Sequence, residues 1–450
     1  MHAKKMIGAT YIIGFLLLRG AAAWTVDITN DITVHMNHVT SIPFNISNLS
    51  SKLSLNITTR NNDIAIPSFR LLQNENSFNG ILNITGVFLG RTKLVFTLEE
   101  NGIKDSQVVS RIIVIREERT IDIIFTASVA ILVSILYINF GCAMDWNVCR
   151  DSLKKPIGPA IGFFCQFLIM PLLSYLIGSL LFPDRPELQI GMFFTGISPS
   201  GGASNIWTVL LDGNLNLSIT MTTICTVAAF GMMPFWIFTL GRHIFAQGNL
   251  TVPYRQIGTF VIGLIIPLII GFVIQKKLPK VSKMLVRIMK PFSIILIIFI
   301  AIFAIITNLY LFKLFSWEIV IAGLGLPWLG FIFGFIIAKI CKQSQANIRA
   351  IAIETGIQNT GVAIFLLRFT LKPPADDLTT VLPVSTAIMT PIPLTVLYII
   401  KLIYQYTQQH RNKMVLETVP SLEKLQQTTD ISTITQLSES KVIDRLTVDN

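Results

Sequence analysis

Charged side chains are scarce in this chain. Only 14% of its 450 residues are Asp, Glu, Lys or Arg, whereas 52% are hydrophobic. A water-soluble globular protein usually carries about 25% charged residues. The shortage excludes a chain that is surrounded by water along its whole length, and it indicates that lipid solvates much of this one.

Acidic residues are the scarcer charge class, with 25 Asp and Glu against 36 Lys and Arg. A basic excess can serve a nucleic-acid partner. Here, however, the largest basic cluster lies between two apolar runs, where the positive-inside rule places cations on the cytosolic side of a membrane. We therefore expect the lipid bilayer, and no nucleic acid, as a partner. The cluster comprises Lys276, Lys277, Lys280, Lys283, Arg287 and Lys290.

Cysteine and histidine are also few, with five of each. No cysteine lies in residues 24–118, which excludes a disulfide there. No histidine accompanies Cys142 and Cys149, as a metal site would need. The run Gly196–Ser200 lacks the final glycine of a nucleophile elbow, and no histidine lies in the apolar segments to activate a serine. We expect neither an enzyme nor a bound cofactor.

The N-terminus has the features of a targeting segment. Lys4 and Lys5 precede an apolar run, Met6–Leu18, and three alanines end at Ala23. The run is shorter than the roughly 20 residues that a spanning helix needs, and its flanks are typical of a signal peptide. We predict a signal peptide over residues 1–23, with an uncleaved anchor as the alternative.

Residues 24–118 are polar and rich in Thr, Ser and Asn. Thr92–Leu98 and Gln107–Ile115 read as two strands joined across a turn that contains Asn101-Gly102, a hairpin signal. We predict a small β-sandwich without a chemical site. Because a signal peptide would deliver it to the secretory lumen, we expect an extracellular, N-glycosylated domain. The four sequons begin at Asn45, Asn48, Asn56 and Asn83.

A succession of apolar segments follows from residue 121. We count nine candidate membrane spans and assign residues 119–404 to a transmembrane domain. Loops predicted to face inward hold twelve Lys and Arg, against six in the outward loops, so we expect the N-terminus outside and the C-terminus in the cytosol. A further sequon at Asn216 would then face inward and stay unused. The nine ranges are 121–141, 156–182, 188–211, 217–240, 256–276, 290–312, 318–341, 346–371 and 378–404.

Two further expectations concern location and the end of the chain. Residues 405–450 are polar and rich in Gln, Thr and Ser, which predicts a disordered cytoplasmic tail. We expect the protein in the plasma membrane, and an internal secretory membrane is the alternative.

Two of the nine spans contain polar, backbone-breaking runs. The third carries SPSGGASN, residues 198–205, and the eighth carries ETGIQNTG, residues 354–361. An acidic side chain at the centre of a spanning helix costs about 2.5–3.5 kcal/mol on insertion scales. Irregular backbone at membrane depth persists only where it lines a cavity or is buried in protein. Two interrupted spans in corresponding halves predict the binding site of a transporter.

The oxygen chemistry of these runs predicts the ion. A carboxylate, hydroxyls, amide oxygens and freed carbonyls are hard donors with one formal charge, which suits an alkali cation better than zinc or copper. A bound Na⁺ would also neutralise Glu354 and remove the cost of burying its charge. Two alternatives stay open: Glu354 is a protonated or hydrogen-bonded packing residue, or its carboxyl couples transport to protons.

At these positions the sequence resembles the bile acid:sodium symporter family, over about residues 120–405. The resemblance rests on three runs: SPSGGASNIWTVLLDGNLNLSITMTTICTVAAFGMMP from Ser198, ETGIQNTG from Glu354 and CQFLIMPL from Cys165. It implies an all-α, polytopic membrane fold with nine transmembrane helices. Inverted repeats would form a core and a smaller panel, with two broken helices crossing at the midplane. Ser200, before the paired glycines, and the β-sandwich-like ectodomain depart from the best-known members.

The resemblance also implies two sodium sites, and every matched position holds a suitable donor. The first site would use Ser204, Asn205, Ser218, Thr222 and Glu354, and the second would use Gln166, Glu354, the carbonyls of Thr355 and Ile357, and Gln358.

The predicted function is sodium-coupled import of a small amphipathic organic anion, of the bile acid or steroid sulfate class, by alternating access. The protein would bind two Na⁺ ions and the organic anion as its partners. Two other functions stay open: a non-transporting receptor or interaction protein that uses the ectodomain, and a proton-coupled organic anion carrier.

Overall fold

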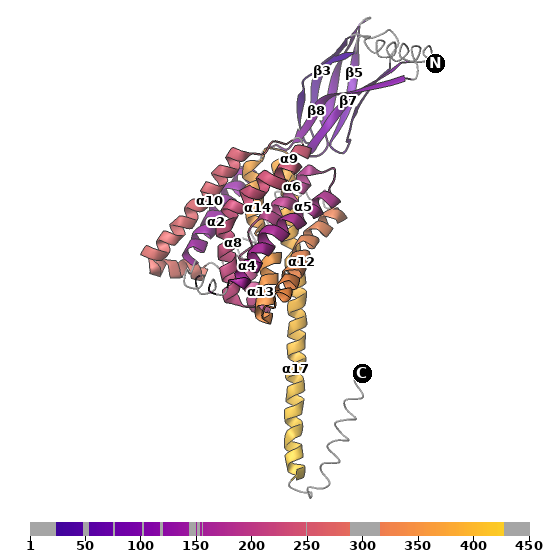
Figure 1. The fold of residues 1–450 in the computed structure, drawn as a ribbon. Helices are drawn as coiled ribbons and strands as arrows, with labels where there is room; N and C mark the ends of the chain where they lie inside the picture. The colour runs from indigo at the N-terminus through magenta and orange to yellow at the C-terminus, as the bar shows by residue number, and fades with distance from the viewer. Residues whose placement is uncertain are drawn as a thin grey trace, which may run out of the picture.

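The computed structural model describes residues 24–47, 54–74, 77–100, 103–117, 120–143, 150, 154, 156–248, 250–288 and 316–426. The predicted signal peptide, the sequon at Asn48 and the sixth expected span (290–312) lie outside these residues. The described chain has a β-rich part at one end and a helical part below it (Figure 1).

The β-rich part is a sandwich of two four-stranded sheets, with the orders β1-β3-β6-β5 and β2-β8-β7-β4. Apolar side chains at alternate positions, such as Val34, Leu82, Phe96 and Ile112, are fully buried between the sheets. This alternation is what a strand with one buried face requires. The strands are β1 (Thr25–Asp27), β2 (Asp31–His35), β3 (Val39–Ser47), β4 (Ser54–Thr59), β5 (Ala65–Asn74), β6 (Ser77–Gly86), β7 (Gly90–Glu100) and β8 (Ile103–Ile115).

The expected hairpin is confirmed. β7 and β8 pair antiparallel, and Glu100 lies opposite Ile103 across the turn. β8 also pairs with β2 in parallel, a long-range pairing that no local signal predicted. Of the predicted glycan acceptors, Asn45 and Asn56 are exposed and Asn83 is half-buried. Glycosylation and the extracellular location of the sandwich stay predictions.

The helical part contains five runs among the described residues that are long and apolar enough to cross a membrane: 157–181, 215–247, 254–277, 317–340 and 375–411. Their outer faces are apolar, because side chains such as Ile262, Ile266 and Ile269 on α10 are exposed, as a lipid-facing helix requires. The helices are α2 (Thr120–Ala143), α4 (Ile157–Phe164), η2 (Cys165–Ile169), α5 (Met170–Leu181), α6 (Pro186–Ile197), α7 (Ala203–Leu210), α8 (Leu215–Trp236), η3 (Ile237–Gly241), α9 (Arg242–Gln247), α10 (Tyr254–Lys277), α12 (Trp317–Ile340), α13 (Gln345–Gly356), α14 (Thr360–Thr370), α15 (Ala375–Leu378), α16 (Val381–Met389) and α17 (Pro391–Gln426).

Two expected spans are broken in the middle. The third divides into α6 and α7 around residues 198–202, and the eighth divides into α13 and α14 around 357–359. Both breaks fall within the runs that the sequence singled out. Because the sixth expected span lies outside the described residues, the total of nine and the inverted-repeat arrangement stay predictions.

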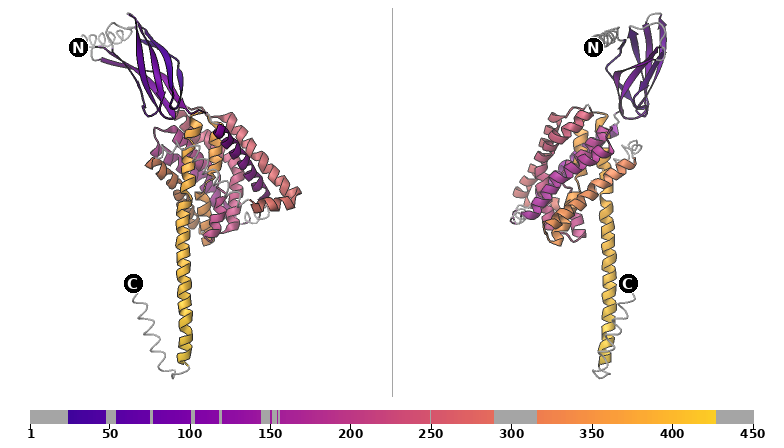
Figure 2. Two further views of the ribbon diagram at one scale, coloured as in Figure 1. Left: turned by 180° about the vertical axis from the view of Figure 1, so that it is seen from behind. Right: turned by 45° about the vertical axis from the view of Figure 1, so that its right-hand side comes forward.

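The prediction of disorder from residue 405 is wrong for residues 405–426. α17 continues to Gln426 as one helix, which projects from the helical part in both views of Figure 2. Gln, Lys, Leu and Glu are good helix formers and residues 405–419 hold neither glycine nor proline, so local propensity favours the helix up to Pro420 although the composition is polar.

Close glycine contacts set two helix pairs. α2 and α10 lie side by side (Figure 1), and a Cβ on Gly141 would come within 2.3 Å of the Leu268 carbonyl oxygen. α12 packs on α13 in the same way, since a Cβ on Gly330 would lie 2.9 Å from Gly356 Cα and one on Gly334 would lie 2.9 Å from Ala352 Cα. Gly330 and Gly334 therefore serve helix packing.

The sandwich rests on the helical part through a loop and an ion pair. Leu89, between β6 and β7, is 3% exposed within an apolar cluster that includes Met192 of α6, Ile319 of α12 and Leu382 of α16. Arg116, which follows β8, lies 3.5 Å from the carboxylate of Asp377 in α15 (Nε to Oδ2). The contact links the two parts at the end of the bundle nearest the strands.

Candidate functional site

The two breaks meet and hold each other by backbone hydrogen bonds. Gly201 N donates to the Ile357 carbonyl at 2.9 Å, and Asn359 N donates to the Pro199 carbonyl at 2.8 Å. These bonds form a short antiparallel bridge between Ser200 and Gln358. The bridge satisfies backbone groups that the broken helices leave free, which allows extended backbone at this depth.

Glycines allow this close approach. A Cβ on Gly201 would lie 3.1 Å from the Gln358 carbonyl oxygen, and a Cβ on Gly356 would fall 2.1 Å from the ring of Phe331. Any larger residue at Gly356 would push α13 away from α12. Gly356 therefore has no room for a side chain against α12, whereas a Cβ on Gly201 would require the crossing chain to shift by a few tenths of an ångström.

A buried carboxyl lies beside the crossing. Glu354, in the last turn of α13, is 1% exposed. Its Oε1 accepts hydrogen bonds from the hydroxyls of Ser200, at 2.6 Å, and Thr222, and its Oε2 accepts one from Ser218 at 2.8 Å. Thr208 in turn donates to Ser218 Oγ at 3.2 Å. We call Glu354 and its three hydroxyl donors the acid cluster.

The carboxyl of the acid cluster has no counter-charge in the part of the chain that the structure describes. Among the described residues, no Lys, Arg or His forms an ion pair with Glu354. Transferring an ionised carboxylate out of water without a partner is costly. If the carboxyl is ionised, three hydroxyl donors reduce that cost and still leave one negative charge in an enclosed position.

Two further oxygens, both in the first turn of α7, are buried without a hydrogen bond in the described chain, and Ser204 is the one that lies close to the Glu354 carboxyl. Ser204 Oγ and Asn205 Oδ1, in the first turn of α7, have no hydrogen-bond partner in the part of the chain that the structure describes. Buried oxygens in proteins are normally satisfied, so each one that is not requires an explanation. A cation held between these oxygens and the carboxylate would satisfy both and supply the missing charge.

A pair of glutamines lies at the bridge, and one of them, Gln358, is a bridge residue. Gln166 Nε2, in the π-helical turn η2, donates to the Ser198 carbonyl at 2.7 Å and to Gln358 Oε1 at 2.7 Å. Gln358 Nε2 donates to the Thr355 carbonyl at 2.8 Å. We call Gln166 and Gln358 the amide pair. It offers neutral amide and carbonyl oxygens only.

The structure brings together most residues of each predicted site, in two separate groups. Ser218 and Thr222 contact Glu354 directly, whereas the described contacts of Asn205 do not include the carboxyl. No described hydrogen bond joins Glu354 to the amide pair, although the sequence assigned it to both sites. The Ile357 carbonyl is taken by Gly201 N.

Sequence reasoning missed the role of Ser200. It was noted only as a residue that differs from the family pattern before the paired glycines, yet its hydroxyl makes a 2.6 Å contact with Glu354. Its position in the same broken run as Ser204 was the available signal. The contact itself joins residues 154 positions apart and is not visible in the sequence.

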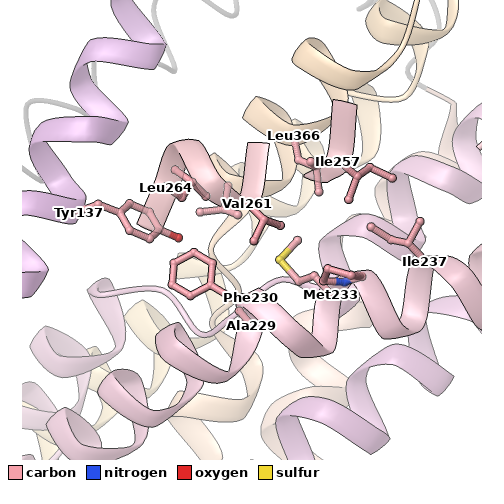
Figure 3. Close-up of a pocket in the computed structure, with 11 residues that line it drawn as sticks. Tyr137, Ala229, Phe230, Met233, Ile237, Ile257, Val261, Leu264 and Leu366 are labelled. Atoms are coloured by element: carbon pink, nitrogen blue, oxygen red, sulfur yellow. The ribbon is translucent and has the colours of Figure 1, made fainter. Parts of the chain in front are cut away.

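An apolar pocket lies between the α2–α10 pair and helices α8 and α14 (Figure 3). Its lining is apolar except for the ring hydroxyl of Tyr137. Ligand pockets are commonly apolar with few polar groups. The lining residues are Tyr137, Ala229, Phe230, Met233, Pro234, Ile237, Ile257, Val261, Leu264, Val362 and Leu366.

Comparison with known proteins identifies the helical part. The sequence pattern of the Sodium Bile acid symporter family matches residues 130–314. The sodium-dependent organic anion transporter of Rattus norvegicus is 32% identical over 257 residues, which cover 56% of this chain and 68% of that protein.

Two other relatives extend the comparison. The ileal sodium/bile acid cotransporter of Cricetulus griseus is 32% identical over 257 residues, which cover 56% of this chain and 72% of that protein. The P3 protein of Homo sapiens is 31% identical over 245 residues, which cover 54% of this chain and 51% of that protein. The β-sandwich lies outside the family match. The chain belongs to the Sodium Bile acid symporter family, whose named relatives are mostly transporters rather than enzymes, and it is a multi-pass membrane protein with an added N-terminal β-rich region.

Proposed function

We propose that this protein is a sodium-coupled symporter that imports an amphipathic organic anion. The observation that carries the proposal is the acid cluster, where two broken helices cross: within the described residues its buried carboxyl has no counter-charge, and two buried oxygens of α7 have no hydrogen bond. Broken helices at a crossing point are where secondary transporters bind their coupling ions. The names of the rat and hamster relatives, which describe sodium-dependent carriers, support the same function.

The first Na⁺ would lie in the acid cluster. Ser204, Asn205, Ser218, Thr222 and Glu354 would supply its oxygens, all of them hard donors that suit an alkali ion. Each hydroxyl that now donates to the carboxylate keeps lone pairs, so it can turn one toward a cation. The ion would replace the missing positive charge.

The second Na⁺ would lie at the amide pair, with Gln166, Gln358, Glu354 and the carbonyls of Thr355 and Ile357 as its oxygen donors. The 2.7 Å hydrogen bond that Gln166 Nε2 donates to Gln358 Oε1 would have to open to free that oxygen for the ion. Two Na⁺ carried with one monovalent anion move one net charge, which the membrane potential favours by about 2.3 kcal/mol per 100 mV.

The apolar pocket is our candidate site for the body of the anion. It lies between the α2–α10 pair and the helices that bear the crossing region, so relative motion of these two groups would open it to alternate sides. Its apolar lining would suit a steroid or bile acid skeleton, but the cavity holds only about 10 Å³ here, so these helices would have to move apart to admit one. The proposal includes nine spans in inverted repeats, an N-terminus outside the cell and a cytoplasmic C-terminus in the plasma membrane.

Uptake measurements in cells that express the protein at their surface test the function. A labelled taurine-conjugated bile salt and a steroid sulfate are supplied with Na⁺ or with choline in its place. We expect uptake in Na⁺ alone, and we expect Glu354→Gln to abolish it, because the amide keeps the shape and removes the charge. Glu318→Gln is the matched control, since this glutamate is exposed in the first turn of α12.

Three results would contradict the proposal. Uptake that continues in choline, or that survives Glu354→Gln at equal surface expression, rejects sodium coupling through this carboxyl. Uptake that follows an imposed pH gradient instead supports the proton-coupled alternative. A surface-expressed protein that takes up none of a panel of organic anions in Na⁺ supports the receptor alternative.

A further inference from the structure

A short helix follows α10 at the end of the bundle that is farthest from the sandwich. Residues 279–288 are helical and continue from Leu278, where α10 ends (Figure 1). If the sandwich lies outside the cell, as proposed above, this helix lies at the cytosolic face of the membrane. None of its residues belongs to the acid cluster, the amide pair or the apolar pocket.

The helix is fixed to the end of α2. Ser282 is 6% exposed, and its hydroxyl donates to the Cys142 carbonyl at 3.2 Å. Gln275 Nε2, in the last turns of α10, donates to the same carbonyl at 3.1 Å. Ser282 is thus the point where the short helix contacts α2, beside the contact that α10 makes with the same carbonyl, and the exposed residues of the short helix lie on its other faces.

One free face is apolar. Val281, Met284 and Ile288 are 39%, 55% and 44% exposed and recur at intervals of three and four residues, and Leu278, at the junction with α10, is 54% exposed. Such a stripe would be unfavourable in water. A helix at this position can bury it among the acyl chains at the membrane boundary.

The other free face is basic. Lys280, Lys283 and Arg287 recur at intervals of three and four residues and are exposed, as are Lys276 and Lys277 at the end of α10. The sequence contains no Asp or Glu between Asp212 and Glu318. Within the described chain, none of these five cations forms an ion pair.

We propose that residues 276–288 bind the headgroups of anionic phospholipids in the cytosolic leaflet. An apolar stripe beside a row of unpaired cations, on a helix at the end of a membrane span, matches an acyl chain below a negative headgroup. A nucleic acid would meet the cations but leave the apolar stripe in water. The site is separate from the coupling-ion site, and its test does not depend on transport.

Native mass spectrometry of the purified full-length protein tests the proposal. The protein is titrated with dioctanoyl phosphatidylserine or dioctanoyl phosphatidylcholine. The triple variant Lys280→Gln, Lys283→Gln, Arg287→Gln should weaken phosphatidylserine binding by about 100-fold, since each cation near the surface contributes about fivefold. Binding of phosphatidylcholine should not change.

The matched control removes three exposed cations at the opposite end of the bundle: Arg185→Gln, Arg242→Gln, Arg255→Gln. It should bind phosphatidylserine like the wild type. The uncharged variant Met284→Gln should weaken both lipids, because it interrupts the apolar stripe. Equal thermal stability of all variants in detergent shows that each has folded.

The proposal is overturned if the Lys280, Lys283 and Arg287 variant keeps its phosphatidylserine affinity, or if the control loses as much. It is also overturned if phosphatidylcholine binds as tightly as phosphatidylserine. Competition by glycerophosphoserine, which has the headgroup without acyl chains, would indicate a site for soluble phosphate esters and would equally reject a lipid site.

Discussion

Thr222 belongs both to the acid cluster and to the proposed ligands of the first sodium ion. Its hydroxyl donates to Glu354 Oε1 and is also a proposed ligand of the first ion. Thr226, one turn further along α8, is equally buried, but its hydroxyl donates only to the Thr222 carbonyl, at 2.7 Å. Comparing variants of Thr222 and Thr226 therefore distinguishes loss of an ion ligand from a change in the packing of α8.

Replacing Thr222 by valine should raise the Na⁺ concentration for half-maximal uptake by about tenfold or more. The change keeps the shape and removes an oxygen whose bond to a charged group is worth about 1.5–3 kcal/mol. Sodium titrations of uptake measure the effect. Thr226→Val should leave the titration unchanged, and equal curves for both variants would remove Thr222 from the ion site.

The amide pair should behave as one unit. Gln166→Ala and Gln358→Ala each break the 2.7 Å hydrogen bond between the two side chains. The double variant should therefore lose less apparent sodium affinity than the sum of the losses in the two single variants. Residues in direct contact show coupling energies of about 0.5–3 kcal/mol. The coupling energy is calculated from the sodium concentrations for half-maximal uptake of the wild type, the single variants and the double variant.

A control pair for this cycle is Gln166→Ala with Gln189→Ala. Gln189 is also buried, but it donates to the Phe182 carbonyl at 2.6 Å, outside the site. This pair should be additive. Additive losses for Gln166 and Gln358 as well would mean that the amide pair does not act on a common ion.

At the scale of elements, α12 holds α13 at a fixed distance through small residues. Gly330→Ala would place a Cβ 2.9 Å from Gly356 Cα and 2.9 Å from Met170 Sδ, so α13 must move. We expect a loss of about 1–3 kcal/mol in the free energy of unfolding and a lower melting temperature in detergent.

Gly325→Ala, on the same helix, is the control because nothing lies within 4 Å of its new Cβ. Alanine there should stabilise α12 by roughly 1 kcal/mol, since glycine is the poorer helix former. Melting curves of both variants should therefore shift in opposite directions. A shift in the same direction would show that glycine content, and not the contact with α13, sets the stability.

The breaks in α6/α7 and α13/α14 could be predicted because proline, paired glycines and polar residues stand inside apolar segments. Their mutual backbone bonds could not, since Gly201 and Ile357 are far apart in the chain. The same holds for Ser200 and Glu354. Composition shows where a helix stops, whereas the partner that satisfies its free groups depends on the packing of the whole bundle.

The failure at α17 has a different physical reason. A polar segment was predicted to be disordered because it cannot bury an apolar face. Tyr406 and His410 lie in its described part, in one unbroken helix with the last apolar segment. Extending an existing helix avoids the cost of nucleating a new one, so composition alone underestimates helix length at such a junction.

At the scale of the molecule, glycosylation tests the orientation of the chain. Asn45 and Asn56 lie exposed on the outer faces of the two sheets, so Asn45→Gln and Asn56→Gln should each remove one step in mass that peptide N-glycosidase also removes. Asn216→Gln should change nothing, because Ser218 of that sequon is buried against Glu354. Glycan on Asn216 alone would reverse the proposed orientation.

The sandwich also joins two groups of helices. Its last strand leads directly into α2, whereas Leu89 and Arg116 contact residues of the other group, in α6, α12, α15 and α16. If transport moves α2 and α10 relative to the rest, the sandwich spans the moving boundary. The sequence predicted the sandwich as a separate unit, because a contact between one loop and distant helix ends leaves no local pattern.

Replacing Leu89 by aspartate should therefore loosen the sandwich from the helices. A carboxylate at this 3% exposed position would lose its hydration among apolar side chains, which costs several kcal/mol or drives the loop out. We expect faster hydrogen exchange in residues 375–382 and an altered maximal rate of uptake. The sodium concentration for half-maximal uptake should not change, because no residue of the acid cluster is touched.

Val87→Asp, in the same loop, provides the control. Val87 is 37% exposed, so its new charge stays hydrated and the contact should remain intact. If the two variants have the same hydrogen-exchange rates in residues 375–382 and the same maximal rate of uptake, the loop does not link the sandwich mechanically to the helices. If Leu89→Asp also changes the sodium dependence, the sandwich acts on the ion site itself, and its coupling must run through α6, whose C-terminal end leads into the crossing region.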